Sequence, residues 1–163
     1  MRRHAPDVAW VARDNLHLTL KFLGAVEGDR LGAVTTALAG AVTARPAFQL
    51  ALSGLGAFPS AVRPRVLWAG IGEGAGAAAD VAARIDAALD PLGFPRETRP
   101  FSAHVTLGRV RAPRAGRGLA EALAAGAPAG RQPVGHVSLM RSELSPRGAR
   151  YTELAALPLA PGG

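Results

Sequence analysis

The sequence predicts an α+β domain built mostly from antiparallel strands, with helices on the outside. Several short segments alternate between apolar and polar residues, and two longer segments show the 3.6-residue period of an amphipathic helix. No regular strand–helix–strand repeat points to a parallel sheet. The chain has 163 residues, of which 48% are hydrophobic. This length suits one packed domain spanning residues 1–163 and is too short for two ordinary ones.

The first expected elements are two strands and a helix. Residues 8–11 are expected to form a short strand, and residues 15–24 a second, half-buried one. The apolar positions of this second strand are Leu16, Leu18, Leu20 and Phe22. From Asp29, a possible N-cap, an apolar stripe with helical spacing begins. Its members are Leu31, Val34, Leu38 and Val42.

The middle of the chain predicts two strands, a helix and a further strand. Segments 47–52 and 65–71 have strand patterns, and the Gly- and Pro-bearing segment 53–64 is expected to be the loop between them. A second helix is predicted from about Gly76 to Leu89. A strand then begins at about Ala103.

The C-terminal third predicts a short helix and a hairpin. The helix is expected near Leu119 to Ala125, and a strand from Val134 to Leu144. The turn Ser145 to Gly148 has the residue order of a type I turn, and a strand follows from Arg150. The tail Pro158 to Gly163 is expected to be frayed.

Composition narrows the classes of partner and compartment. The net charge of +7 and the pI near 11.5 suggest an anionic partner such as nucleic acid, or a solvated basic surface. There is no cysteine, so disulfides and thiolate metal sites are excluded. No apolar run approaches the roughly 20 residues of a membrane span, and a signal-peptide core is lacking after the basic pair at the start. We therefore expect a cytoplasmic protein.

The word His-x-Thr-Leu occurs twice, as "HLTL" from His17 and as "HVTL" from His104. On a strand, residues two apart share a face, so His17 lies beside Thr19 and His104 beside Thr106. Both pairs are separated by the same distance along the chain (104 − 17 = 87 and 106 − 19 = 87). This repetition predicts a pseudo-duplicated domain with two lobes facing a common cleft.

Two histidines and two hydroxyls across a cleft suit the cleavage of a phosphodiester. In-line displacement at phosphorus needs a base for the incoming oxygen and an acid for the leaving oxygen, and histidine can serve as either. Threonine hydroxyls can donate hydrogen bonds to the non-bridging oxygens. The scheme requires no metal. A metal site or purely structural strand positions are the alternatives, and the residues alone do not decide which histidine is the acid.

Other side chains are weaker candidates. Strict alternation places Arg109 on the Leu107 face, so it reaches the phosphate only if the strand ends or bulges after Thr106. Phe58 and Phe101 are candidates to stack on a base, with a core position as the alternative for each. Arg141 is a candidate contact to RNA, with an exposed salt bridge as its alternative.

Together, these motifs and their flanking segments resemble the two-histidine phosphoesterase superfamily. The segments that carry the resemblance are the two His-x-Thr-Leu words, "RPRVLWAG" at 63–70, "RPFSAHVTLGRV" at 99–110 and "RSELSPRGARYTEL" at 141–154. Within the superfamily the sequence is most similar to the RNA 2′,3′-cyclic phosphodiesterases, also called LigT-like 2′-5′ RNA ligases. The resemblance extends from about Val8 to Leu159.

The resemblance implies a bilobed, pseudo-twofold α+β fold in which two mostly antiparallel sheets flank a central cleft. It implies hydrolysis of RNA or nucleoside 2′,3′-cyclic phosphates to 2′-phosphates, with neither metal nor cofactor. His17 is then the proton donor and His104 the proton acceptor. Thr19 and Thr106 occupy the positions that hold the phosphate, and Arg109 matches an arginine position beyond the second motif.

Two further activities fit the same residues. One is 2′-5′ RNA ligation or 2′-5′ phosphodiester cleavage, and the other is binding of RNA ends without turnover. Members of the resembled family usually carry a hydrophobic strand and a helix before the segment matching Val8 to Leu20. We therefore expect those elements to be missing here, and dimerisation through an exposed sheet edge would be a possible consequence.

Overall fold

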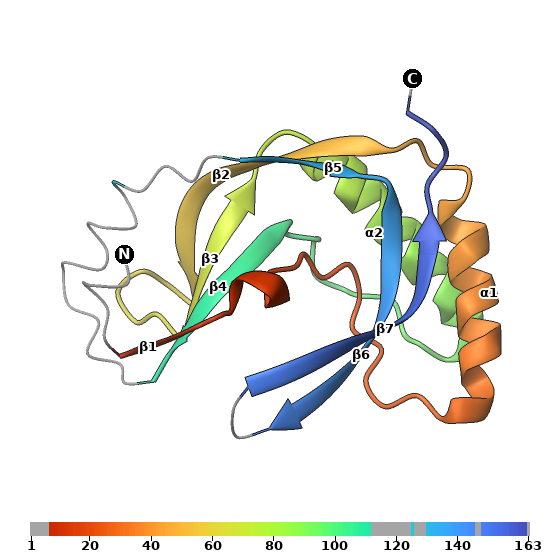
Figure 1. Cartoon of the computed structure of the whole chain (residues 1–163), viewed down its shortest axis with the longest axis horizontal. Coiled ribbons are helices and arrows are strands. Elements are labelled where there is room, and N and C mark those ends of the chain that lie inside the picture. Colours follow the sequence, from red (N-terminus) through yellow and green to blue (C-terminus); the bar gives the residue numbers. More distant parts are fainter. Residues whose placement is uncertain (1–6, 112–124, 126–129, 146–147, 163) are drawn as a thin grey trace. The chain divides into compact units, whose positions relative to one another are not determined.

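The computed structural model describes residues 7–111, 125, 130–145 and 148–162 (Figure 1). It is an α+β fold with two α-helices and antiparallel sheets among these residues, as the sequence predicts. The described residues fall into two compact units. The sheet unit is drawn from Met1–Thr19, Leu50–Glu73 and Ala103–Arg131, and the helical unit from Leu20–Gln49, Gly74–Ser102 and Gln132–Gly163. Within the described part, no helix is long and apolar enough to cross a membrane.

The larger sheet has five strands in the order β1-β4-β3-β2-β5. In chain order, these strands are β1 (Val8–Trp10), β2 (Phe48–Phe58), β3 (Val66–Ile71), β4 (His104–Val110) and β5 (Arg131–Val134). β4 lies between β1 and β3 and pairs antiparallel with both (Figure 1). One face of the sheet carries a small apolar cluster around buried Val8 and Leu67. This cluster leaves the other face available for polar side chains.

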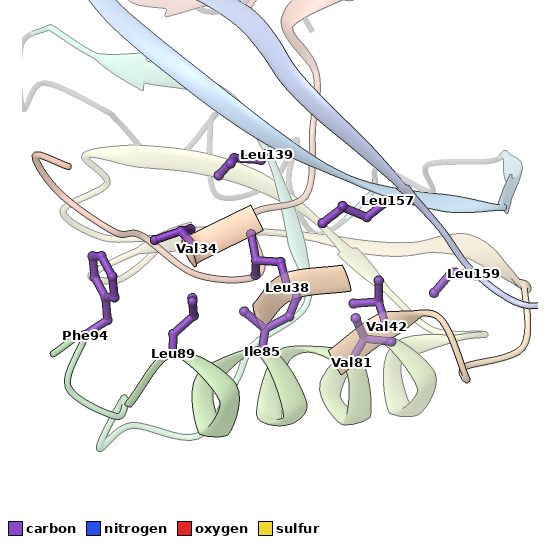
Figure 2. Packing of buried hydrophobic residues seen from close by; sticks show 10 residues of the cluster. All are labelled: Val34, Leu38, Val42, Val81, Ile85, Leu89, Phe94, Leu139, Leu157 and Leu159. Atoms are coloured by element: carbon purple, nitrogen blue, oxygen red, sulfur yellow. The ribbon is translucent and has the colours of Figure 1, made fainter. Parts of the chain in front are cut away.

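The helical unit combines two helices with a hairpin. The helices are α1 (Leu31–Val42) and α2 (Ala75–Leu89), and the hairpin strands are β6 (His136–Ser145) and β7 (Gly148–Pro158). Apolar side chains of these elements and of the segments that follow α2 and β7 form one buried cluster, shown in Figure 2. Its members are Val34, Leu38, Val42, Val81, Ile85, Leu89, Phe94, Leu139, Leu157 and Leu159.

Both helices follow their predicted stripes. Val34, Leu38 and Val42 recur every four residues and are buried, because this spacing places them on one face of α1. Asp29 is not the N-cap, however. It lies in a 3₁₀ turn at Gly28–Arg30, and the capping position is Arg30, without a side-chain cap. The expectation for Asp29 was wrong because the extra turn moves the start of the helix past it.

The strand expected at residues 15–24 does not form. Only Leu18 makes a β-bridge, and Phe22 is 83% exposed. The reason is that the chain changes unit after Thr19, and Leu20 and Leu23 then pack into the helical core. Two apolar residues three apart cannot follow the two-residue alternation of a single strand.

Two other boundaries differ from the prediction. The first half of the loop expected at 53–64 is strand, because β2 runs on to Phe58 through a bulge between Leu52 and Leu55, where Gly54 takes a φ of +69°. The strand expected from Val134 to Leu144 is divided between β5 and β6.

The expected fraying of the tail is wrong as far as Ala160. Leu159 is buried, and the backbone of Ala160 forms hydrogen bonds with Arg45 and Ala47. The helix expected near Leu119 to Ala125 lies outside the described residues except for Ala125. The two central residues of the turn from Ser145 to Gly148 lie outside them as well.

Candidate functional site

The two His-x-Thr-Leu motifs meet directly in the sheet unit. Leu18 and Val105 form an isolated antiparallel bridge on the edge of β4 opposite to β3. In an antiparallel register, this bridge sets His17 opposite Thr106, and Thr19 opposite His104. Neighbouring residues alternate between faces, so these four side chains share the face opposite to Leu18 and Val105. Directly opposed residues have Cβ atoms about 5 Å apart, which is close enough for both motifs to contact one phosphate group.

His17 is held by the turn that precedes it. The 3₁₀ turn Arg13–Asn15 ends one residue before Leu16, and the Asn15 carbonyl oxygen lies 2.8 Å from His17 Nδ1. A carbonyl oxygen only accepts hydrogen bonds, so Nδ1 carries a proton in this geometry. Exchange of a catalytic proton would then take place at Nε2. The side chain of His17 is exposed, which makes this nitrogen reachable by a ligand.

His104 lies in an aromatic corner of the same face. The Phe58 ring lies edge-on to the imidazole, with centroids 5.2 Å apart and an interplanar angle of 80°. The centroid of Trp68 lies 6.3 Å from that of His104 and 5.2 Å from that of Phe58. These contacts restrict the ring of His104, which is half-buried where His17 is exposed.

A glycine makes room for the indole in this corner. Gly56 lies opposite Trp68 in the sheet, and a Cβ built on Gly56 would overlap Cζ2 and Cη2 of the indole. Trp68 therefore lies across the bare backbone of β2, and its ring neighbours those of both Phe58 and His104. Sequence reasoning did not single out Trp68. Its position depends on the register of β3, which pairs Trp68 with Thr106 and which the local sequence does not encode.

Arg109 joins the face of the two motifs through a bulge. Thr106 is paired with Trp68 but Gly108 with Leu67, so Leu107 is one extra residue on β4. Arg109 is consequently paired with Val66, which has the same face as Trp68 because the two are separated by two positions on β3. The bulge after Thr106 thus brings Arg109 to the face of His104 and Thr106.

The remaining candidates are distributed between the two units. Phe58 is 38% exposed and belongs to the aromatic corner in the sheet unit. Phe101 is half-buried and belongs to the helical unit. Arg141 also belongs to that unit, where it is exposed on β6 opposite Thr152. The sheet register that assembles the motifs therefore does not include Phe101 or Arg141.

An ion pair anchors the chain immediately after the first motif. Lys21 Nζ donates hydrogen bonds to the Asp86 carboxylate and, at 2.8 Å, to the Pro95 carbonyl oxygen. The Lys21 side chain is only 9% exposed. The Lys21 ammonium above all, together with the backbone N–H of Glu97, lowers the pKa of Asp86 below its ordinary value. The pair therefore ties Lys21, which follows the first motif in the chain, to α2 and to the loop after that helix.

Metal-binding side chains do not gather at this site. Throughout the part of the chain that the structure describes, no three His, Cys, Asp or Glu side chains group as ligands of one ion. The chemical groups that the site does bring together are two imidazoles, two hydroxyls and a guanidinium on one sheet face.

Comparison with known proteins places both motifs within a described family. Residues 1–146 match the 2′-5′ RNA ligase superfamily. The chain is 34% identical over 154 residues to the RNA 2′,3′-cyclic phosphodiesterase of Methanothermobacter thermautotrophicus, covering 93% of this chain and 83% of the relative. The enzyme of the same name from Archaeoglobus fulgidus is 41% identical over 101 residues, which are 62% of this chain and 55% of that relative.

Solved structures show the same likeness. Escherichia coli LigT complexed with 3′-AMP has a TM-score of 0.76 and 31% identity, over 96% of this chain and 85% of LigT. LigT has also been solved with ATP, with a TM-score of 0.72. The Thermus thermophilus protein TT0787 has a TM-score of 0.77 and 29% identity, over 94% of this chain and 82% of that protein. The α+β arrangement described above is therefore LigT-like.

Proposed function

Because the chain belongs to the 2′-5′ RNA ligase superfamily, we propose that it hydrolyses the 2′,3′-cyclic phosphate of RNA ends and nucleosides to a 2′-phosphate. The observation that supports this best is the Leu18–Val105 bridge, which brings both motifs to one face. The curated relatives to which the chain is similar are named as RNA 2′,3′-cyclic phosphodiesterases.

In the proposed reaction, water attacks phosphorus in line with the P–O3′ bond. His104 accepts a proton from the water as the new P–O bond forms, and His17 donates a proton to O3′ as the P–O3′ bond breaks. The product is a 2′-phosphate with a 3′-hydroxyl. His17 then recovers its proton from solvent, and His104 releases the one it gained. The exposure of His17 favours its role as the residue that meets the leaving ribose oxygen.

The phosphate is held by groups that also lie on this face. Thr19 and Thr106 donate hydrogen bonds to the non-bridging oxygens, and the crossed register gives each histidine a hydroxyl from the other motif. The Arg109 guanidinium neutralises the negative charge that these oxygens carry. Phe58 offers a half-exposed ring for stacking on the base. Phe101 and Arg141 stay predictions as contacts to the base and the RNA backbone.

The decisive test uses small substrates and an excess of chelator. The purified protein is incubated with each nucleoside 2′,3′-cyclic monophosphate in EDTA, and the product isomers are separated by chromatography. We expect turnover to a 2′-phosphate. A predominant 3′-phosphate would mean that the P–O2′ bond breaks, and it would reopen the assignment of donor and acceptor. Loss of activity in EDTA with recovery on adding one divalent metal would replace the two-histidine mechanism by a metal-dependent one.

Ligation is a second candidate, because the matching family is described as 2′-5′ RNA ligases. A 5′-hydroxyl of a second RNA in place of water would give a 2′-5′ linkage with the same acid and base. Adding a 5′-hydroxyl oligonucleotide to the assay distinguishes the two reactions. If neither occurs while RNA ends still bind, the chain is an RNA-end-binding module.

A further inference from the structure

Three arginines line one pocket of the sheet unit, beyond the second motif along the chain. The pocket has a volume of about 350 Å³. It lies where β3 begins and β4 ends, and its walls are Pro64, Arg65, Val66, Arg109, Val110 and Arg111. A volume of this size accommodates a phosphate with part of its ribose.

The backbone that carries these arginines is well fixed. Arg65 N–H donates to the Phe58 carbonyl at 2.7 Å, and the Arg65 carbonyl accepts from Val110 N–H at 2.9 Å. Arg111 N–H donates to the Asp7 carbonyl at 2.8 Å. The guanidinium groups are therefore presented from the ends of paired strands, so that binding of an anion requires little ordering of the backbone.

Among the residues that the structure describes, no acidic side chain forms an ion pair with these three arginines. Five other basic side chains form ion pairs within the described residues, namely Lys21, Arg45, Arg84, Arg96 and Arg131. Arg65, Arg109 and Arg111 are not among the arginines that form such pairs in the described part of the chain. Three neighbouring positive charges repel one another, and an anion that bridges them removes this repulsion. Guanidinium groups bind phosphate oxygens in bidentate fashion.

The pocket continues from the face of the two motifs. Arg109 lines the pocket and also shares the face of His104 and Thr106. At a strand rise of about 3.3 Å per residue, Arg111 lies roughly 20 Å along β4 from His104. A mononucleotide bound at His104 cannot reach that far, whereas an RNA chain of a few nucleotides can.

From these observations we propose that Arg65, Arg109 and Arg111 bind the phosphodiester backbone of single-stranded RNA, on the 5′ side of the terminal cyclic phosphate. This inference rests on the proposed function, since it assigns the preferred substrate of the same site. The preferred substrate is an oligonucleotide with a 2′,3′-cyclic end, and the mononucleotide is the poorer one. The polyphosphate of a free nucleotide has the same chemistry and is the alternative occupant.

The test compares a nucleoside 2′,3′-cyclic monophosphate with an RNA hexanucleotide that ends in the same cyclic nucleotide. The variant is Arg65→Gln/Arg111→Gln, and Arg109 is left in place because it belongs to the proposed phosphate site. Arg65→Lys/Arg111→Lys retains the charge. Arg84→Gln is the matched control, because it removes one exposed arginine from the surface of α2. Binding of a fluorescein-labelled hexanucleotide ending in a 2′-phosphate is measured in parallel at several salt concentrations.

We expect the hexanucleotide to have the higher kcat/KM in the unmodified protein, through a lower KM. The double Gln variant should lose about tenfold in kcat/KM on the hexanucleotide, and the slope of log affinity against log salt should fall by about 1.4, for two lost phosphate contacts. Its activity on the mononucleotide should stay within about twofold of normal, as should both activities of Arg84→Gln. The double Lys variant should retain most of the salt dependence, because the charges remain.

Three results would overturn the proposal. The first is an equal loss on both substrates, and the second is an unchanged hexanucleotide affinity in the double Gln variant. The third is inhibition by inorganic triphosphate that depends on the two arginines without any advantage of the hexanucleotide, which would assign the pocket to a free nucleotide. Absence of turnover with intact, arginine-dependent RNA binding would instead refute the proposed hydrolysis and leave the RNA site standing.

Discussion

Leu18 and Val105 are joined by one antiparallel bridge, and this bridge sets the histidine of each motif opposite the threonine of the other. The two words are equivalent in the sequence, but their surroundings differ. Asn15 holds Nδ1 of exposed His17, whereas half-buried His104 packs against Phe58 and Trp68. Such a difference allows two identical groups to take opposite roles as acid and base.

Replacing either histidine is expected to abolish most of the turnover. His17→Ala and His104→Ala should each lower kcat by two to four orders of magnitude, about the contribution of one general acid or base. The double variant should be little worse than the single ones, because the two groups act in one step. Circular dichroism should be unchanged. Activity close to normal in either single variant would falsify the two-histidine mechanism.

The threonines should matter less than the histidines and about equally. Thr19→Val and Thr106→Val keep the side-chain shape and remove only the hydroxyl, so kcat/KM should fall by an amount equivalent to about 2–4 kcal/mol. Thr36→Val is the control, since Thr36 is exposed on α1 and its hydroxyl donates to the Gly32 carbonyl of the same helix. If kcat/KM fell in only one of these two Val variants, the two motifs would not share the phosphate.

The rate should pass through a maximum as pH is varied. Turnover needs one neutral histidine and one protonated histidine, so it falls on both sides of the optimum. Each single variant should lose one side of this pH profile. Without the base, which we propose is His104, the rate should no longer fall at low pH, and without the acid, which we propose is His17, it should no longer fall at high pH. The pair of profiles therefore assigns donor and acceptor independently of product analysis.

Gly56 should be intolerant of even one methyl group. Gly56→Ala forces the Trp68 indole away, at a cost of about 1–3 kcal/mol in the free energy of unfolding. Because Trp68 packs between Gly56 and His104, kcat should fall as well. Gly40→Ala is the control. A Cβ built on Gly40 meets no described atom within 4 Å, and replacing a helical glycine by alanine stabilises the helix by about 0.5–1 kcal/mol. Thermal unfolding and kcat together check both outcomes, and an unaffected Gly56→Ala would contradict the packing role.

The Lys21–Asp86 pair should stabilise the fold in a pH-dependent way. Lys21→Met should lower the free energy of unfolding at neutral pH by about 2–3 kcal/mol, because Asp86 loses its main partner. The lowered pKa of Asp86 means that the contribution is complete above the ordinary value of 3.8 and is lost as pH falls through the folded-state pKa. The difference in the free energy of unfolding between the unmodified protein and Lys21→Met should therefore become smaller at acidic pH. Arg84→Gln, at an exposed pair, should show little effect at any pH.

Local pattern predicted α1 and α2 well and the boundaries of strands less well. The stripe of α1 was readable because Val34, Leu38 and Val42 face one core. The failure at residues 15–24 has a physical cause, since Thr19 and Leu20 pack in different units and no single period describes both. Likewise, the glycines and prolines of 53–64 predicted a loop, but the glycine at position 54 serves a bulge within β2.

The candidate site was predictable as residue types but not as a geometry. Repetition of His-x-Thr identified the four motif residues, whereas their crossed pairing depends on a contact across the sheet that no local pattern encodes. The sequence could place Arg109 on the face of the motifs only if the strand bulged after Thr106, and the structure has that bulge at Leu107. Trp68 was missed because its position beside His104 follows from the register of β3 with β4 and from the missing side chain at Gly56.

The bridge between the motifs also bears on how the protein folds. It joins residues that are 87 positions apart (105 − 18 = 87). Closing a chain loop of that length costs about 4 kcal/mol beyond a constant term, more than the about 1 kcal/mol that one backbone hydrogen bond contributes. The contact therefore depends on the pairing of β1 with β4, which brings Trp10 beside Gly108 and leaves only a short loop to close. Long-range pairing of this kind is slow. During refolding, catalytic activity should return in the last kinetic phase, after most of the secondary structure, and a fragment with only one motif should have no activity.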